Sequence, residues 1–484
     1  MTQTERHVRS SERRGAPERP APAFIHLVDD ADDGDGTPLH EKLYQRVRKL
    51  ILSGALQHGS RLAPSRSLAS LLGISRNSVM TALDRLISDG LLESRHGSGV
   101  YVRYSGARRS SANVNRADDQ ADALFPFQLG IPPIDIFPAM LWRRLQSRRW
   151  RHISPALLRD DDPAGWLGLR EAIAAHAAMT RGLECSADQI VVTSCTAAGV
   201  DLVVRSLGLS GSEVWMENPG YASAAQALQN GGVRLVPVDV DRSGLDVDAG
   251  RRVAPRARAA YVTPTCQFPL SVTMSPARRR ALTAWVQEQN AWLLEDDFDW
   301  TSSGANPPPK PLAAQVPSRT IYFNTFNHIL FPTLRIGYIV APPALVDRFV
   351  AIQRGINGSS NIPNQMVLAD FINGGHLDDH IKRLKECQSE RRAALLHALE
   401  TQLADFLVPR SDRAGSHIIC KTRNLNAGEI VSIAAAKGIS ITPMANYQFI
   451  ADSGDHVLLG YGGFTPVVIE EAASKLRAAL KSVG

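Results

Sequence analysis

Short apolar runs that alternate with helical patterns constrain the fold of this chain more than any other feature. Six examples follow Phe125: QIVVTS, RLVPVDV, AAYVTP, AWLLEDD, TIYFNTF and RIGYIVA. Strands joined by helices of moderate length are typical of a largely parallel sheet that is covered on both faces. From about Gly375 the pattern is first helical and then mixed, which predicts a smaller α+β lobe. We therefore expect an α/β domain with a mostly parallel central sheet.

A separate and regular segment, residues 38–103, precedes this pattern. Its first helix is predicted from apolar residues at helical spacing, namely Leu39, Leu43, Val47, Leu50 and Ile51. Two shorter helices follow, with a turn at Gly73 between them and Ser75 able to cap the second. The stretch ESRHGSGVYVR then alternates through a glycine-rich turn, the form of a two-stranded wing. This order of elements predicts a winged helix-turn-helix.

Positive charge is concentrated in the same short segment. The whole chain carries a formal net charge of +6, and residues 38–102 contain nine Lys or Arg against four acidic residues. The second short helix is expected to present outward Ser75, Arg76, Asn77 and Thr81. Such side chains suit phosphate oxygens and major-groove base edges. A small helical bundle with a basic surface is the simpler alternative, but the ordered elements favour binding of double-stranded DNA.

The segments that flank this unit have no periodic apolar pattern. Residues 1–37 are predicted to be a disordered tail, and residues 104–126 have the composition of a flexible linker. Five scattered cysteines form no CxxC pair, so no metal site is expected. No apolar run approaches the ~20 residues of a membrane helix, and the N-terminus does not look like a secretory signal. The sequence thus favours a cytoplasmic protein.

The chain resembles a known combination of two domains. Residues 38–102 resemble the winged helix of GntR-type regulators, which implies DNA contacts from Arg66, Arg76, Asn77, His96 and Gly97, with Arg61 nearby. From Phe127 onward the chain resembles fold-type I aminotransferases. Six segments match in order: GWLGLREAIAAH, VVTSCTAAGVDL, ENPGYASA, YVTPTCQFP, LLEDDFDW and TFNHILFPTLRIGY. The combination is similar to the MocR/GabR regulators and implies a homodimer.

The resemblance also implies a site for pyridoxal 5′-phosphate. Ser194, Cys195 and Thr196 lie between a strand and a helix start, where backbone N–H groups point at an anion, here the cofactor phosphate. Tyr221 matches the aromatic residue that stacks on the pyridine ring. Asp296 matches the carboxylate that pairs with the ring nitrogen.

Two of the implied phosphate contacts carry further expectations. Arg335 matches an arginine that binds the phosphate in bidentate fashion, and its apolar neighbours Leu334 and Ile336 argue against a surface position. Cys195 stands where the family usually has glycine, so we expect the backbone there to approach the phosphate differently.

The departures from the family pattern cluster at one edge of the implied site. The family motif reads Ser-Lys-x-Leu-x-Pro-x-Leu-Arg, and His328 replaces its lysine. Imidazole cannot form the covalent bond that a lysine amine forms with the cofactor aldehyde. Phe298 replaces a tyrosine whose hydroxyl would bond the phenolic oxygen, and Lys310 is the one lysine between Lys49 and Lys382. No secure counterpart of the substrate-carboxylate arginine is found, His456 being nearest.

Three hypotheses follow for the function. The first is a DNA-binding transcriptional regulator whose large domain senses a small phosphate- or carboxylate-bearing effector, is catalytically inactive, and holds pyridoxal phosphate non-covalently at most. The second is a working aminotransferase with an accessory winged helix, which the missing lysine disfavours. The third is a regulator whose large domain is a dimerisation scaffold with no ligand. We favour the first, and the sequence names neither the operator nor the effector.

Overall fold

The computed structural model describes residues 37–95, 97–104, 124–152, 154–155, 162–304, 307–356, 361–410, 415–450 and 455–482. Contacts divide the chain into two compact units, residues 1–122 and 123–484. The predicted tail lies outside the described residues except for Thr37, and the predicted linker except for 104 and 124–126. No helix in these described ranges is both long and apolar enough to cross a membrane.

The first unit has the predicted order of helices and wing. Its elements are α1 (Leu39–Leu52), α2 (Ser65–Leu72), α3 (Arg76–Ser88), β1 (Leu92–Arg95) and β2 (Gly99–Val102). Gly73 ends α2 in the left-handed region at φ 64°, which lets the chain turn into α3. Ser75 caps α3, because its Oγ accepts a hydrogen bond of 3.0 Å from the backbone N–H of Ser78. The two strands pair antiparallel and form the wing.

A single apolar cluster holds this unit together. The predicted inward side of α3 is buried, and so are three of the five apolar residues that lie at helical spacing in α1; together they are Leu43, Val47, Ile51, Val79, Leu83 and Leu86. Leu50 is partly buried against the cluster. Leu39 belongs to the predicted helix, but its side chain is 54% exposed at the first position of α1. The helical spacing is correct there, but no other element of the unit covers the first turn.

The second unit is built on an eight-stranded sheet in the order β3-β10-β9-β8-β7-β4-β5-β6. These strands are β3 (Ile190–Thr193), β4 (Glu213–Asn218), β5 (Arg234–Asp241), β6 (Gly244–Leu245), β7 (Ala259–Val262), β8 (Trp292–Asp296), β9 (Thr320–Thr325) and β10 (Gly337–Val340). Strands β9, β8, β7, β4 and β5 are parallel to one another. β10 is antiparallel to both neighbours, and β6 is antiparallel to β5. The sheet is therefore mostly parallel, as predicted.

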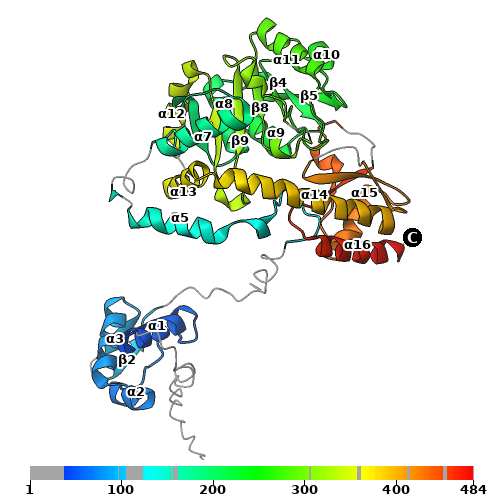
Figure 1. Cartoon of the computed structure of the whole chain (residues 1–484). Coiled ribbons are helices and arrows are strands. Elements are labelled where there is room, and N and C mark those ends of the chain that lie inside the picture. The colour runs from blue at the N-terminus through cyan, green and yellow to red at the C-terminus, as the bar shows by residue number, and fades with distance from the viewer. Residues whose placement is uncertain are drawn as a thin grey trace, which may run out of the picture. The chain divides into compact units, whose positions relative to one another are not determined.

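Helices cover both faces of this sheet (Figure 1). They are α5 (Ala139–Arg151), α7 (Leu167–Arg181), α8 (Thr196–Leu207), α9 (Ala222–Asn230), α10 (Val247–Val253), α11 (Pro276–Glu288), α12 (Pro343–Ile356) and α13 (Ile362–Asn373). Alternate strand residues decide which helices they meet: Val191 packs in the cluster of α8, α9 and α12, and Val192 in the cluster of α5, α7 and α13. Because both faces are covered, the strands β3, β7 and β8 are mostly apolar and buried, which explains their continuous runs in the sequence.

A smaller lobe follows, as the mixed pattern after Gly375 predicts. The long helix α14 (His376–Gln402) runs from α13 into this lobe (Figure 1). Its sheet has the order β11-β12-β14-β13, with β11 (Leu407–Pro409), β12 (His417–Thr422), β13 (Thr442–Pro443) and β14 (His456–Gly460). Two further helices, α15 (Ala427–Ala435) and α16 (Pro466–Lys481), pack on it. Phe127 is buried in the same core, so the start of the second unit is anchored in this lobe.

Candidate functional site

The exposed face of α3 is the candidate nucleic-acid interface. Ser75, Arg76, Asn77 and Thr81 are all exposed, as predicted from the helical spacing. Some of their polar atoms already have partners within the unit. The Thr81 hydroxyl donates to the backbone carbonyl of Asn77 at 2.9 Å, and Arg76 Nε donates to Ser65 Oγ at 3.4 Å. The guanidinium of Arg76 and the amide of Asn77 remain the groups best suited to base edges.

The other predicted DNA contacts surround this face. Arg66 is exposed on α2, and Arg61 is exposed and forms an isolated bridge with Tyr101 of the wing. Gly97 lies in the wing turn at φ 71°, a conformation that favours glycine. His96 lies outside the described residues. The exposed arginines and the wing thus form one basic surface within this unit.

In the second unit, the predicted cofactor residues come from different elements and meet at one edge of the sheet. We call this group the sheet-edge site; its members are Ser194, Cys195, Thr196, Tyr221, Asp296, Phe298, His328 and Arg335. Asn327 joins two of the contributing loops, because its Nδ2 donates to the Ser194 carbonyl at 3.1 Å and its Oδ1 accepts from the N–H of Ile336 at 2.9 Å. Tyr221 interacts electrostatically with Asp296, Cys195 and Arg335.

One side of the site, which we call the anion end, consists of Ser194, Thr196 and Arg335. Thr196 is the first residue of α8, a helix of 12 residues whose N-terminal N–H groups carry a partial positive charge. Cys195 precedes it with φ −169°, an extended conformation that any residue adopts. The backbone conformation at this position does not require the glycine that is common in the family. It therefore gives no reason to expect the backbone at Cys195 to approach a phosphate differently.

Arg335 differs from its sequence prediction. Leu334 and Ile336 are buried, but Arg335 itself is exposed, so the argument from apolar neighbours was wrong. Its backbone is left-handed, with φ 53°, at the end of the 3₁₀ helix η6 (Pro332–Leu334), and this conformation turns the side chain away from the core. Within the described residues, the guanidinium has no hydrogen bond or ion pair, which leaves its donors available to an anion.

Asp296, at the end of β8, is buried and already has protein partners. Tyr261 donates its hydroxyl to Oδ2 at 2.6 Å, and the N–H of Phe298 donates to Oδ1 at 3.2 Å. Burial raises the pKa of the Asp296 carboxyl to about 7, with the Tyr261 hydrogen bond acting in the opposite direction. This carboxyl can therefore gain or lose a proton near neutral pH, which suits a partner that is itself basic.

The other side of the site, which we call the 328 end, consists of Phe298, Asp299 and His328. His328 Nε2 lies 3.6 Å from Asp299 Oδ1, beyond hydrogen-bonding distance, and both atoms are buried without a hydrogen-bond partner. The Phe298 and His328 rings meet edge to face at 5.4 Å. Burial raises the pKa of the Asp299 carboxyl, and His328 acts in the opposite direction. Lys310 does not bring an amine to the 328 end, because it is exposed and lies beside Gly182.

Aromatic rings and an apolar face form a wall beside the site. The ring of Phe268 contacts those of Tyr221, Phe298, Tyr447 and His417. Next to them, the sheet of the small lobe contributes a cluster of Ile419, Met444 and Leu458, with Leu129, Leu270 and Tyr447 packed against it. His456 lies two residues before Leu458 in β14, and its ring contacts Arg410 Nη2 at 3.2 Å. The residues of β14 include no arginine that could bind a substrate carboxylate.

Several residues of the site were not identified from the sequence. Tyr261, Asp299 and His417 each place a polar atom within this group, and Asn327 ties the site together. Asp299 follows Asp296 in the run EDDFD, so a carboxylate near residue 328 could have been suspected. His417 had no local signal, because it reaches the site from a strand of the small lobe more than 80 residues further along the chain.

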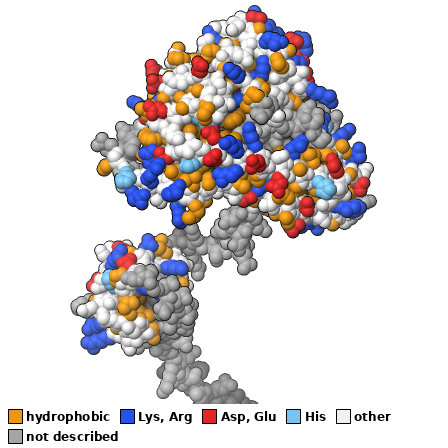
Figure 2. All heavy atoms as spheres, viewed as in Figure 1, with side chains coloured by type: hydrophobic (Ala, Val, Ile, Leu, Met, Phe, Trp, Pro, Cys, Tyr) orange, Lys and Arg blue, Asp and Glu red, His pale blue; other side chains and the backbone are white. Residues whose placement is uncertain are grey.

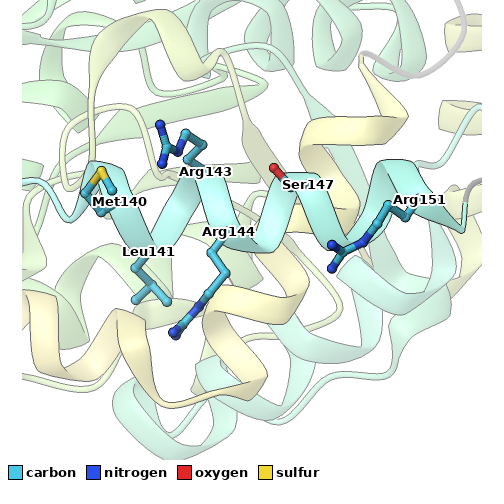
Figure 3. Close-up of a pocket in the computed structure, with 6 residues that line it drawn as sticks. All are labelled: Met140, Leu141, Arg143, Arg144, Ser147 and Arg151. Atoms are coloured by element: carbon cyan, nitrogen blue, oxygen red, sulfur yellow. The ribbon is translucent and has the colours of Figure 1, made fainter.

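Two surface hollows of the second unit lie away from this site. One of about 500 Å³ runs along α5 and is lined by Met140, Leu141, Arg143, Arg144, Ser147 and Arg151. Figure 3 shows these six side chains projecting from the same helix. The other, of about 460 Å³, includes Arg258, Trp292 and Arg319, at the opposite edge of the sheet. Neither hollow includes a residue that the sequence analysis predicted.

The comparisons with known proteins agree with this two-part organisation. Residues 39–102 match bacterial regulatory proteins of the gntR family, and residues 145–444 match aminotransferase class I and II. The whole chain is 34% identical over 481 residues to the probable rhizopine catabolism regulatory protein MocR of Rhizobium meliloti, covering 94% of this chain and 96% of that protein. The chain belongs to the MocR-type regulators of the gntR family.

Further MocR-type relatives and solved aminotransferases agree. The chain is 29% identical over 431 residues to the pyridoxine biosynthesis transcriptional regulator PdxR of Corynebacterium glutamicum, covering 88% and 92% of the two chains. α-Aminoadipate aminotransferase LysN of Thermus thermophilus superimposes with a TM-score of 0.67 at 22% identity, covering 76% of this chain and 94% of that one. Kynurenine aminotransferase of Pyrococcus horikoshii superimposes with a TM-score of 0.67 at 22% identity, covering 79% of this chain and 98% of that one. Identities this low show the fold alone.

Pyridoxal phosphate is the group that this fold implies, and this MocR-type chain fits it in part. The exposed Arg335 and the start of α8 fit a phosphate, and the buried Asp296 fits a ring nitrogen. His328 does not fit a covalent attachment, because imidazole does not condense with an aldehyde as a primary amine does. The residues present therefore fit a cofactor-like molecule held without a covalent bond.

Proposed function

We propose that this chain is a DNA-binding transcriptional regulator whose large unit binds a small phosphate-bearing molecule and does not catalyse amino transfer. The observation that carries the proposal is the contrast at the sheet-edge site. Arg335 is exposed without a partner among the described residues, whereas the position of the cofactor lysine holds His328, turned toward Asp299. A site that keeps its anion contacts and lacks its amine suits binding rather than turnover.

For DNA, α3 acts as the recognition helix. Its exposed Arg76 and Asn77 read base edges in the major groove, while Arg61 and Arg66 neutralise phosphates beside it. As a dimer the regulator binds two half-sites, because each subunit contributes one winged helix.

Gel-shift titrations at several salt concentrations test this assignment. Arg76→Ala and Asn77→Ala should each weaken specific binding by about 1–3 kcal/mol. Arg66→Ala should weaken binding to all sequences and reduce the slope of affinity against salt. Arg48→Ala, which removes the same charge from α1, is the matched control and should leave the preference among sequences unchanged. If the full chain ignores DNA at low salt, the regulator assignment is wrong.

For the ligand, the anion end provides the main contacts. Arg335 pairs with the phosphate, and the N–H groups at the start of α8 donate to it together with the hydroxyls of Ser194 and Thr196. When bound, pyridoxal phosphate would supply an aldehyde and a pyridine ring that accepts electrons. Tyr221 and Phe268 flank this ring, and Asp296 holds a proton at the ring nitrogen.

Thermal unfolding with and without ligand tests the binding step. Pyridoxal phosphate should raise the melting temperature in a concentration-dependent manner, because a ligand that binds the folded state stabilises it by mass action. Arg335→Ala should abolish this shift. If neither pyridoxal phosphate nor inorganic phosphate stabilises the parent chain, the large unit is a dimerisation scaffold instead.

Single-turnover measurements test the absence of chemistry. With an amino donor and bound pyridoxal phosphate, no pyridoxamine phosphate should form, because His328 offers no amine. The visible absorption of the protein after dialysis, with and without borohydride, should show no trapped cofactor. Turnover on the order of 1–10³ s⁻¹, typical of enzymes, would show that this is a working aminotransferase.

We also propose that the regulator is a homodimer. Large exposed apolar side chains gather at the start of the second unit, at Leu124, Phe125, Ile134, Met140 and Trp150. Figure 2 shows such side chains next to Lys and Arg near the lower left of this unit, where Figure 1 places α5. Exposed apolar side chains that form a patch mark protein interfaces, and we propose that these residues form one. Met140→Asp should therefore weaken the dimer in sedimentation equilibrium, whereas Met179→Asp, at an equally exposed side chain of α7, should not.

A further inference from the structure

The 328 end contains buried polar atoms that have no hydrogen-bond partner within the described residues. They are Nε2 of His328, Oδ1 of Asp299 and Nδ1 of His417. The Asp299 side chain is 3% exposed and that of His328 is 15% exposed. A buried polar atom without a partner costs free energy, so three such atoms in one place suggest that a hydrogen bond is completed when something binds.

The position of Asp299 favours one of the two neutral tautomers of the His328 ring. Asp299 faces Nε2 at 3.6 Å, and a carboxylate favours the tautomer that places the proton on the nitrogen nearest to it. Nδ1 then carries a lone pair. Nδ1 of His328 makes no hydrogen bond to a described residue, and it is not among the buried atoms that lack a partner. It is therefore open to solvent. His328 thus presents a hydrogen-bond acceptor at the place where a lysine would present an amine.

Two rings that interact with His328, those of Phe298 and His417, present no free donor to it. Phe298 has no hydroxyl. His417 donates from Nε2 to the carbonyl of Pro269 at 2.7 Å, so its buried Nδ1 is an acceptor. Burial lowers the pKa of His417 to about 4, which keeps this ring neutral. Because Oδ1 of Asp299 and Nδ1 of His417 are buried, the polar atom that Phe298, Asp299, His328 and His417 together offer to a bound group is Nδ1 of His328. As an acceptor, this atom cannot pair with an aldehyde oxygen.

We propose that the Asp299–His328 pair makes the sheet-edge site selective for a phosphorylated ligand that carries a hydrogen-bond donor, a hydroxymethyl or aminomethyl group, over the corresponding aldehyde. The proposal rests on the function proposed above, namely that the anion end binds a phosphate. A donor on the ligand pairs with Nδ1 of His328, and Nε2 then donates a hydrogen bond to Asp299. An aldehyde oxygen is an acceptor like Nδ1, so both atoms would remain without a hydrogen-bond partner.

Equilibrium titration of the full chain with three phosphorylated pyridines tests the selectivity. We expect pyridoxine 5′-phosphate and pyridoxamine 5′-phosphate to bind roughly tenfold more tightly than pyridoxal 5′-phosphate, the factor expected for one hydrogen bond. This ranking uses the parent protein and needs no variant. A tenfold preference for the aldehyde, or equal affinity for all three, would overturn the proposal.

Two variants assign the selectivity to the pair. His328→Phe keeps the ring shape, removes both nitrogens and should reduce the preference to within about twofold. Asp299→Asn should also reduce it, because an amide can donate to Nε2 and so move the imidazole proton to Nδ1. Both variants should bind inorganic phosphate as the parent does, since Arg335 is unchanged; a merely structural effect would lower phosphate affinity too.

The same titrations separate the two levels of the argument. If the parent binds all probes through Arg335 but His328→Phe keeps the full preference, the pair is not the cause and this inference fails alone. If inorganic phosphate and all three pyridines fail to bind the parent chain, the proposed ligand site itself is wrong, and the inference fails with it.

Discussion

The two ends of the sheet-edge site differ in the exposure of their polar side chains. At the anion end, Arg335 is exposed and has no partner among the described residues, so its donors face outward. At the 328 end, Asp299 is buried, the side chain of His328 is 15% exposed, and the two face each other at 3.6 Å. One end presents to an external group a guanidinium that is unpaired among the described residues, and the other holds an internal pair. If the proposed function is right, binding and chemistry occupy separable parts of this fold.

The largest expected effect comes from restoring the amine at the 328 end. His328→Lys should bind pyridoxal phosphate covalently, because the anion end still positions the phosphate. The variant should become coloured, and borohydride should fix the cofactor on residue 328, which peptide mass spectrometry locates. The double variant with Arg335→Ala is the control and should lose most of this labelling. A colourless His328→Lys protein in excess cofactor would mean that the two ends do not belong to one site.

A buried arginine provides the next contrast, in stability. Arg181 is buried and donates from Nε to Asp297 at 2.6 Å, whereas Arg335 is exposed. Arg181→Met should lower the free energy of unfolding by about 3–5 kcal/mol, because it leaves a buried charge without its partner. Arg335→Met should change it by less than about 0.5 kcal/mol. Urea unfolding measures both, and equal losses would contradict the assignment of Arg335 to ligand binding.

Asp296, between the two ends, should give a pH-dependent effect. Its pKa is raised by burial from 3.8 to about 7, so the folded state holds the proton to a higher pH than the unfolded state does. The stability that this group contributes is complete below about pH 4 and is lost as the pH rises to about 7. Relative to Asp296→Asn, the parent should therefore lose on the order of 4 kcal/mol between pH 4 and 8.

Thermal unfolding of both proteins across this pH range measures that difference. Other buried carboxyls with raised pKa values, such as Glu217 and Glu295, are present in both proteins and cancel in the comparison. A stability difference that is constant with pH would show that Asp296 titrates as an ordinary carboxyl.

The smallest effect is expected for Cys195 at the anion end. Its backbone is extended at φ −169°, so glycine brings no conformational advantage there. Cys195→Gly should change stability by less than about 1 kcal/mol and leave phosphate affinity within about twofold. Titration with inorganic phosphate checks this, and a large gain in affinity would show that the cysteine side chain obstructs the anion end.

Much of the fold follows from local patterns in the sequence. Ser75 caps α3 because a hydroxyl can accept from an N–H within the next turn, a relation that involves three residues. The strand ending in Asp296 was recognisable because burial on both faces requires a continuous apolar run. The predicted place of Thr196 at the start of a helix was equally local. Such features depend on neighbours in the chain, and so the sequence alone predicts them.

The direction of individual side chains did not follow from local patterns. Leu39 has the predicted helical spacing but is exposed, because no element covers the first turn of α1. Arg335 lies between two buried residues and is exposed as well, because its left-handed backbone points the side chain outward. Neither result could be predicted from apolar neighbours. Periodicity gives the spacing of a face, and only the packed structure decides whether something lies against it.

By itself, the sequence predicted that a winged helix precedes an α/β domain, and the resemblance of its motifs places His328 where a cofactor lysine is expected. Both facts depend on the order and spacing of residue types. Tertiary structure alone decided that Asp299 and His417 meet His328, because β8, β9 and the small lobe come together only in the folded chain. Side chains that are far apart in the sequence come into contact only when packing brings their elements together.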